Sequence, residues 1–303
     1  MIDLHSLAEL AEKYPEALAT PVAPLRIGSS TIDTDTIPAI MATVNLSRDS
    51  TYRESIAPDT DTAVSMSVVA SAQGADVVDI GAESTTAKAA RVSGADQISQ
   101  LVPVIEQCAA AGVATSVETY QPEVTRACLK AGAVLLNMTG AQHQRDMFEL
   151  AAEYRATVVV CYAAGADVRE ITDVELGADP IPVLADHFAA RVELARSHGV
   201  TDIVIDPGMG FYYGNLVDPK VRAQHQARVI LNSFRLRTLG LPICQALPHA
   251  FDLFRDQYRS AEGFFAVLAR LGGAGLLRTH EVPLVAAVSR SLGFLDTVDP
   301  DSH

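Results

Sequence analysis

Polar residues able to do chemistry follow nearly all of the short apolar runs in this sequence. In chain order they are Asn45, Glu83-Ser84-Thr85, Glu118-Thr119, Asn137, Cys161-Tyr162, Asp206-Pro207-Gly208, Gln245 and Arg278-Thr279-His280. Taken singly, most of them have a structural explanation, because Asp-Pro-Gly is a common turn and an arginine often pairs with a surface carboxylate. Their recurrence at the same place in successive units predicts one shared site.

The residue types divide into two chemical groups. Glu118, Asn137 and Asp206 offer carboxylates and an amide, which could recognise the donors and acceptors along the edge of a flat heterocycle such as a 2-aminopyrimidinone. The second group suits a phosphate or diphosphate, held directly or through Mg²⁺, and comprises Asn45, Arg278 and His280. The pattern therefore predicts binding of a small molecule at these residues.

The elements that must position these side chains alternate between strand and helix. The predicted strands are near-continuous apolar runs, typical of parallel strands covered on both faces: Ala39–Val44, Val77–Ile80, Ala114–Val117, Val134–Leu136, Thr157–Cys161, Ile203–Ile205, Pro242–Cys244 and Gly275–Leu277. Segments with helical periodicity lie between them, such as the one that carries Ile98, Leu101, Val102 and Ile105. This rhythm predicts an α/β protein with a (β/α)₈ barrel, and a doubly wound open sheet is the alternative.

The predicted organisation is one barrel with a short N-terminal cap. Residues 1–36 form the cap, with a helix near Leu7–Tyr14 and a β-like stretch near Leu25–Ile32. Residues 37–295 form the barrel, and residues 296–303 are a C-terminal tail. Because the carboxyl ends of barrel strands meet at one rim, the polar residues that follow the strands should lie together there.

Composition and charge exclude several classes of function. The chain has 303 residues and a formal net charge of −14, from 23 Lys+Arg against 37 Asp+Glu, so we expect neither a nucleic-acid nor an anionic-membrane partner. A few local Arg or His residues could still bind a small anionic substrate. The four cysteines are widely spaced and no signal peptide or apolar span is evident, which predicts a cytoplasmic protein with reduced thiols.

Several motifs, in order along residues 37–290, resemble those of the dihydropteroate synthase family. The segments are Ala42-Thr43-Val44-Asn45-Leu46-Ser47-Arg48-Asp49-Ser50, Asp79-Ile80-Gly81-Ala82-Glu83-Ser84-Thr85, Ser116-Val117-Glu118-Thr119-Tyr120, Leu136-Asn137, Asp206-Pro207-Gly208-Met209-Gly210-Phe211 and Arg278-Thr279-His280-Glu281-Val282. The resemblance implies a pterin-binding TIM barrel. It further implies an enzyme that joins a hydroxymethyl-dihydropterin diphosphate to p-aminobenzoate and releases pyrophosphate, with Mg²⁺ assisting.

The resemblance also assigns roles to residues. Asp206, Asn137 and Glu118 would bind the pterin, and Thr85 would lie beside the substrate. The diphosphate would be held by Asn45, Arg278 and His280, with Asn45 near the metal. Members of the family commonly dimerise, so a homodimer is expected.

The chain departs from the family pattern at the predicted seventh strand. The family carries Gly-x-Ser-Arg-Lys-Ser there, whereas this chain reads Cys244-Gln245-Ala246-Leu247-Pro248-His249 and has no lysine after Lys220. Gln245 and His249 are either new substrate contacts or structural residues, and Lys88 or Arg91 could replace an arginine of the second loop. Two alternatives to a synthase therefore stay open. One is a pterin-binding paralogue without synthase activity, and the other is a pterin- or folate-dependent methyltransferase.

Overall fold

The computed structural model describes residues 2–50, 52–84, 89–163, 173, 177–210 and 213–294. Two residues singled out by the sequence, Thr85 and Lys88, lie outside these ranges. The predicted tail at 296–303 lies outside them as well.

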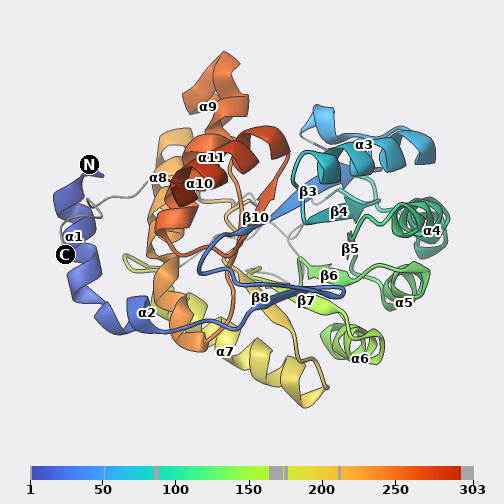
Figure 1. Ribbon diagram of the computed structural model, residues 1–303, viewed down its shortest axis with the longest axis horizontal. Helices are drawn as coiled ribbons and strands as arrows, with labels where there is room; N and C mark the ends of the chain where they lie inside the picture. The colour runs from blue at the N-terminus through green and yellow to red at the C-terminus, as the bar shows by residue number, and fades with distance from the viewer. Residues whose placement is uncertain are drawn as a thin grey trace.

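Eight parallel strands curve into a nearly closed barrel, seen at the centre of Figure 1. They are β3 (Ala39–Asn45), β4 (Val77–Gly81), β5 (Thr115–Glu118), β6 (Leu135–Met138), β7 (Thr157–Cys161), β8 (Ile203–Asp206), β9 (Cys244–Ala246) and β10 (Leu276–Thr279). Seven parallel pairings run in the order β8-β7-β6-β5-β4-β3-β10-β9. An isolated parallel bridge between Ile205 and Ile243 joins the two edges. The prediction of a barrel over an open sheet is confirmed.

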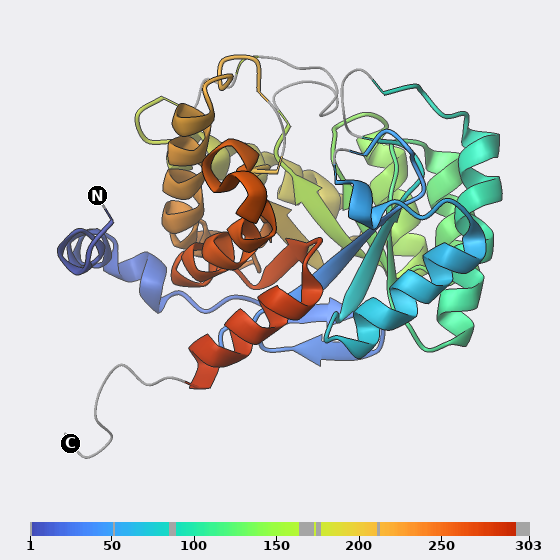
Figure 2. The same cartoon turned by 90° about the horizontal axis from the view of Figure 1, so that it is seen from above.

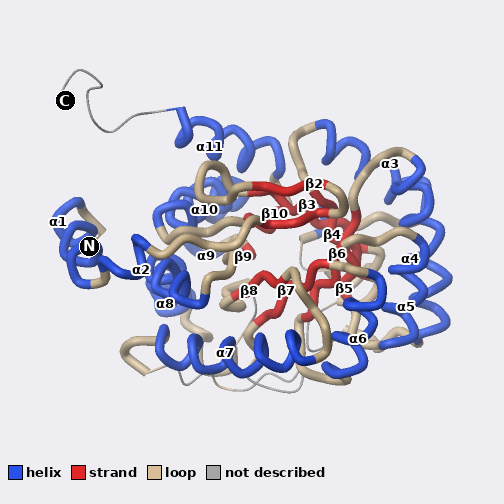
Figure 3. Tube along the Cα trace, turned by 60° about the horizontal axis from the view of Figure 1, so that its bottom comes forward, coloured by secondary structure: helices blue, strands red, loops and turns tan. Residues whose placement is uncertain are grey.

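Helices surround the strands, as the tube in Figure 3 shows. After the strands in turn come α3 (Thr60–Ala72), α4 (Gly94–Ala110), α5 (Pro122–Ala131), α6 (Gln144–Tyr154), α7 (Ile181–Ser197), α8 (Pro219–Asn232) with the 3₁₀ turn η2 (Ser233–Leu239), α9 (Phe251–Phe254) with η3 (Arg255–Ser260) and α10 (Ala261–Leu271), and α11 (Val282–Phe294). A further 3₁₀ turn, η1 (Arg53–Ser55), precedes α3. Within the described ranges no helix is long and apolar enough to cross a membrane.

The N-terminal segment closes one end of the barrel. Two helices, α1 (Leu4–Lys13) and α2 (Pro15–Ala19), lead into an antiparallel hairpin of β1 (Leu25–Ile27) and β2 (Ser30–Ile32). The single β-like stretch expected at Leu25–Ile32 is therefore two strands, because Gly28 turns the chain with φ +60°. Leu25 and Ile27 pack against the interior of the barrel, and Figure 2 shows the hairpin at the end away from the long loops.

The prediction for the seventh barrel strand was wrong by two residues. We expected Pro242–Cys244, whereas β9 covers Cys244–Ala246. Ile243 forms an isolated bridge to Ile205, and the residue pairing with β10 begins at Cys244. The apolar run ends at Cys244, so the buried polar Gln245 looked like the start of a loop.

Strand alternation divides the side chains into an interior layer and a layer under the helices. One buried cluster contains only interior residues of the strands and the hairpin, including Met41, Val77, Leu135, Val204 and Leu276. Because successive side chains on a strand point to opposite faces, the residue two positions after each of these also points inward. Those second positions form the next layer toward the rim.

Candidate active site at the carboxyl ends of the strands

A layer of charged and amide side chains lies directly above the apolar interior of the barrel. Asp79, Asn137, Asp206 and Arg278 each stand two residues after a member of the interior cluster, and Glu118 ends β5 beside Gly81 of β4. The carboxylates and the amide are at most 7% exposed. Polar side chains from five strands of the barrel therefore form one buried layer.

Arg278 is the centre of this layer. Its Nε donates to Asp79 Oδ2 at 2.9 Å and its Nη2 donates to Glu118 Oε2 at 3.1 Å. Asp79 also accepts from Ser116 Oγ at 2.6 Å and from Asn137 Nδ2 at 2.9 Å. Within the described part of the chain, the third guanidinium nitrogen, Nη1, has no hydrogen-bond partner. Arg278 can therefore still donate to a ligand while two carboxylates hold it in place.

Burial changes the acidity of these groups. Desolvation raises the pKa of Glu118 to about 7, although the Arg278 guanidinium opposes the shift. Burial also raises the pKa of Asp206, against the opposing effect of the backbone N–H of Gly208. The pKa of Arg278 is raised despite its burial, because the charges of Asp79 and Glu118 favour the guanidinium cation. The pKa of Glu118 therefore lies near neutral pH, so its charge can change there.

The raised pKa of Glu118 predicts a pH dependence of stability. Between its ordinary value of 4.5 and about 7, the folded protein holds this proton and the unfolded chain does not, so unfolding releases a proton. This one group should therefore lower the free energy of unfolding, by on the order of 3 kcal/mol, as pH rises through that window. Denaturant unfolding of wild type and Glu118→Gln at pH 5 and pH 8 isolates the effect. The stability of wild type relative to the variant should fall as pH rises, and a rise would show that Glu118 ionises at low pH.

Asn137 on β6 and Asp206 on β8 flank β7, and Cys161 of β7 contacts both side chains. Asn137 Nδ2 binds Asp79, and its Oδ1 lies 3.6 Å from Cys161 Sγ. Asp206 Oδ1 accepts the backbone N–H of Gly208 at 2.7 Å, and the thiols of Cys161 and Cys244 also donate to the Asp206 carboxylate. The amide oxygen and the carboxylate thus have weak thiol partners, which a ligand with stronger N–H donors can replace.

Asn45 ends β3 at the edge of this layer. Its Nδ2 donates to Ser55 Oγ at 2.7 Å and to Ser50 Oγ at 3.1 Å. These bonds orient the amide and leave Oδ1 without a donor among the described residues. An amide oxygen held in this way is a suitable ligand for Mg²⁺, which prefers oxygen.

His280 belongs to a second group rather than to a shared grip with Arg278. Its ring stacks on that of Tyr52, with centroids 4.5 Å apart and planes at 18°, and lies 4.9 Å from the ring of His249. Burial lowers the pKa of His280 well below its ordinary value, so the folded protein holds it as a neutral imidazole at neutral pH. Arg278 faces the two carboxylates instead. Arg278 and His280 therefore have different neighbours in this structure, and their common role in binding a diphosphate stays a prediction.

Gln245 does not face the other predicted site residues. It stands between Cys244, which is in the interior cluster, and Ala246, and it pairs in register with Leu277 of the outer cluster. Alternation therefore turns its side chain toward the helices. It is 0% exposed, and neither of its side-chain polar atoms has a hydrogen-bond partner in the described ranges. The structure gives no reason to keep Gln245 as a substrate contact.

The second-loop arginine candidate is engaged by a buried glutamate. Arg91 Nη1 lies 3.2 Å from Glu83 Oε1, and Gln97 Nε2 donates to the other oxygen of Glu83 at 2.9 Å. The contact connects the start of α4 with the end of β4. Arg91 therefore links the residues before α4 to the end of β4, and Lys88 and Thr85 lie outside the described residues.

Sequence reasoning missed three residues of the site. Asp79 pairs with Arg278, Tyr52 stacks on His280, and Glu262 accepts the backbone N–H of His280 at 3.0 Å. The signal for Asp79 was a charged residue inside the otherwise apolar run Val77–Ile80. Tyr52 and Glu262 gave no comparable signal, since a loop aromatic and a glutamate in a first helical turn are ordinary.

The comparisons with known proteins agree with this geometry. The family model described as "Pterin binding enzyme" matches residues 41–280. A dihydropteroate synthase of Streptococcus pyogenes is 31% identical over 70% of this chain and 78% of that protein. A probable bifunctional folylpolyglutamate synthase/dihydropteroate synthase of Halobacterium salinarum is 32% identical over 94% of this chain, which spans only 34% of that longer protein.

A solved structure has the same fold. Dihydropteroate synthase of Xanthomonas albilineans with 4-aminobenzoic acid superposes with a TM-score of 0.76 and 26% identity, over 92% of this chain and all of that one. The matched range contains every strand of the barrel except the first residues of β3, and it ends at His280. The chain belongs to the dihydropteroate synthase family of pterin-binding enzymes.

Proposed function

We propose that this enzyme is a dihydropteroate synthase-like transferase, which condenses a hydroxymethyl-dihydropterin diphosphate with p-aminobenzoate or a related amine and releases pyrophosphate. The observation that carries the proposal is the buried level of Asp79, Glu118, Asn137, Asp206 and Arg278, because it offers both charged acceptors and a guanidinium to one flat ligand. The relatives named as dihydropteroate synthases support the synthase over a non-catalytic paralogue or a methyltransferase.

In this proposal the pterin lies in the barrel mouth with its amino-pyrimidinone edge toward Asp206 and Asn137. The Asp206 carboxylate accepts the two N–H groups of that edge in place of the cysteine thiols. Asn137 is already oriented by Asp79, so its Oδ1 can accept a further N–H. Glu118 and the free Nη1 of Arg278 contact the remainder of the ring.

The diphosphate lies toward the rim, near Asn45 and His280. Asn45 Oδ1 fits Mg²⁺, because the two serine hydroxyls fix the amide and leave that oxygen open. When bound with the diphosphate, Mg²⁺ supplies charge that stabilises the departing pyrophosphate. Asp79 and Glu118 hold Arg278 in place, so that its Nη1 can donate to the ligand and orient the ring below the leaving group.

The lysine that the family pattern places after the seventh strand is absent, and this changes the side chains at that edge of the site. In place of Ser-Arg-Lys the chain has the segment that ends in His249, which lies 4.7 Å from Tyr52 and 4.9 Å from His280, ring to ring. These aromatic side chains provide stacking surfaces where the family pattern provides a cation. The second substrate therefore contacts aromatic side chains here, in place of the Ser-Arg-Lys segment of the family pattern.

Equilibrium titration with the pterin diphosphate tests the substrate assignment. We expect wild type to bind at least about tenfold more tightly with Mg²⁺ than with EDTA, because a metal ion held at Asn45 Oδ1 would balance the charge of the diphosphate. The variant Asn45→Ala should lose most of this dependence while it keeps the binding seen in EDTA. Equal affinity with and without Mg²⁺ in wild type would contradict the role of Asn45.

The cellular setting forms part of the same proposal. All four cysteines are buried free thiols, which supports a reducing cytoplasm. A homodimer is expected from the family resemblance, and sedimentation at several protein concentrations measures it.

A further inference from the structure

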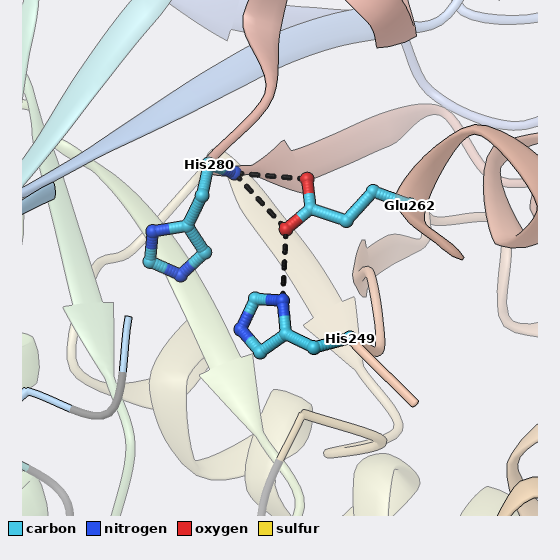
Figure 4. Close-up of side chains that lie close together, drawn as sticks. All are labelled: His249, Glu262 and His280. Atoms are coloured by element: carbon cyan, nitrogen blue, oxygen red, sulfur yellow. Dashed lines mark hydrogen bonds and ion pairs between the residues drawn. The ribbon is translucent and has the colours of Figure 1, made fainter. Parts of the chain in front are cut away.

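Three side chains at the β9 and β10 end of the barrel mouth bring metal-ligating atoms together. They are His249, in the segment before α9, Glu262, in the first turn of α10, and His280, directly after β10. One ring nitrogen of each histidine and one carboxylate oxygen all lie within 4.8 Å of one another. Figure 4 shows the carboxylate of Glu262 reaching toward both His249 and the backbone of His280. No other group of three such residues in the described part of the chain is this compact.

Glu262 is a buried carboxylate with no arginine or lysine as a partner among the described residues. It is 0% exposed, and its one ion-pair contact in that part of the chain is with His249, where Nδ1 lies 3.1 Å from Oε1. Its Oε2 accepts the hydroxyl of Thr279 and the backbone N–H of His280 at 3.0 Å. Its Oε1 accepts only a longer contact of 3.3 Å from the same N–H. A buried negative charge is costly unless a cation balances it, and Oε1 is the atom best placed to bind one.

The two imidazoles also have nitrogen atoms without hydrogen bonds. His249 Nδ1 is close to Glu262 but not in a hydrogen-bonding direction, and it has no other partner among the described residues. His280 Nδ1 also lacks a partner there, but Figure 4 shows this nitrogen on the side of the ring away from Glu262, so the other ring nitrogen, Nε2, faces the cluster. Buried polar atoms without a partner are uncommon in folded proteins, and a bound ion can supply the missing contact. Tyr52 packs against both rings, at centroid distances of 4.5 Å and 4.7 Å, and holds them on one side of the carboxylate.

We propose that His249, Glu262 and His280 bind a divalent transition-metal ion, with zinc as the best fit. Two imidazole nitrogens and one carboxylate oxygen form a ligand set that zinc favours, and three protein ligands leave one position open. Magnesium and calcium are disfavoured because they require mainly oxygen ligands. The site is thus different in residues and in chemistry from the Mg²⁺ position at Asn45.

An ion here would place positive charge where the chain lacks the lysine of the family pattern. His280 follows Arg278 by two residues, and His249 occupies the altered segment after β9. The open position would accept an anionic oxygen, either the carboxylate of the second substrate or the diphosphate. This consequence rests on the proposed function, whereas the binding of the metal does not.

Direct metal titration tests the site without any substrate. Full-length protein is stripped with EDTA, exchanged into chelator-free buffer and titrated with Zn²⁺ in competition with a chromophoric chelator. Wild type should bind one Zn²⁺ per chain, and His249→Ala should bind at least about 100-fold more weakly, since even residues behind the ligands change affinity by 10- to 100-fold. Co²⁺ in place of Zn²⁺ should give intense visible absorption bands typical of four-coordinate sites.

Two further variants separate a lost ligand from a lost fold. His198→Ala is the matched control, because His198 lies 3.9 Å from Glu149 in a histidine–glutamate pair outside the cluster, and it should bind zinc like wild type. Glu262→Gln keeps an oxygen to accept the backbone N–H groups and removes the charge, so it should lose zinc as His249→Ala does. Unchanged zinc affinity in His249→Ala would overturn the proposal, as would displacement of zinc by millimolar Mg²⁺. Because no pterin is present, either result is independent of whether the synthase activity exists.

Discussion

Replacing Arg278 with methionine should lower the free energy of unfolding by about 3–5 kcal/mol, because the change leaves two buried carboxylates without their cation. Asp79 is 1% exposed and Glu118 is 7% exposed, and both bind the guanidinium within 3.1 Å. Urea unfolding measured at pH 7.5 gives the difference. The variant should also show no detectable transfer activity, since it lacks the side chain that holds Asp79 and Glu118 in place and donates to the pterin.

The exposed pair of Arg126 with Glu153 provides the matched control. Its nitrogen–oxygen distance of 3.0 Å resembles that of the buried pair, but both side chains are more than half exposed. Arg126→Met should therefore cost no more than about 1 kcal/mol. If both variants lower the free energy of unfolding by the same amount, Arg278 does not balance the two buried carboxylates as we propose.

Replacing Asp206 with asparagine should weaken pterin binding by about 1.5–3 kcal/mol, or roughly 10- to 150-fold. The carboxylate accepts two N–H groups in the proposed complex, whereas an asparagine amide offers one acceptor and turns a donor toward the same edge. Calorimetric titration with the pterin diphosphate and with the pterin alone measures the loss. The affinity for both ligands should fall by the same factor, because Asp206 contacts the ring and not the diphosphate.

Asp202 serves as the control for this variant. It precedes β8 at the opposite end of the barrel and pairs with Arg26 at 2.8 Å. Asp202→Asn should change pterin affinity by less than a factor of about two. An Asp206→Asn protein with wild-type affinity would refute the assignment of the pterin edge.

The fold and most of the site could be predicted from the sequence, because local signals carry them. Apolar runs of three to six residues mark strands covered on both faces, and the polar residues that follow these runs lie toward the common rim. Asn137, Asp206 and Glu118 were found in this way, and the structure brings them to one level with Arg278. The motif resemblance supplied the ligand, which spacing alone does not specify.

The remainder depends on the direction of side chains and on contacts distant in sequence. Gln245 is next to interior residues, yet a one-residue change on a strand turns a side chain to the other face. Asp79 is 199 residues from Arg278 in the chain, so the ion pair between them cannot be predicted from the sequence around either residue. The cluster of His249, Glu262 and His280 likewise joins three separate elements.

Turnover is the most direct test of the central claim, that this chain is a synthase despite the absent lysine. Purified protein is incubated with the pterin diphosphate, p-aminobenzoate and Mg²⁺, and pyrophosphate and dihydropteroate are measured together. The proposed function predicts equal amounts of the two products, both dependent on p-aminobenzoate and both lost in Arg278→Met. Tight binding of the pterin diphosphate with no pyrophosphate released, for p-aminobenzoate or for related aromatic amines, would contradict it.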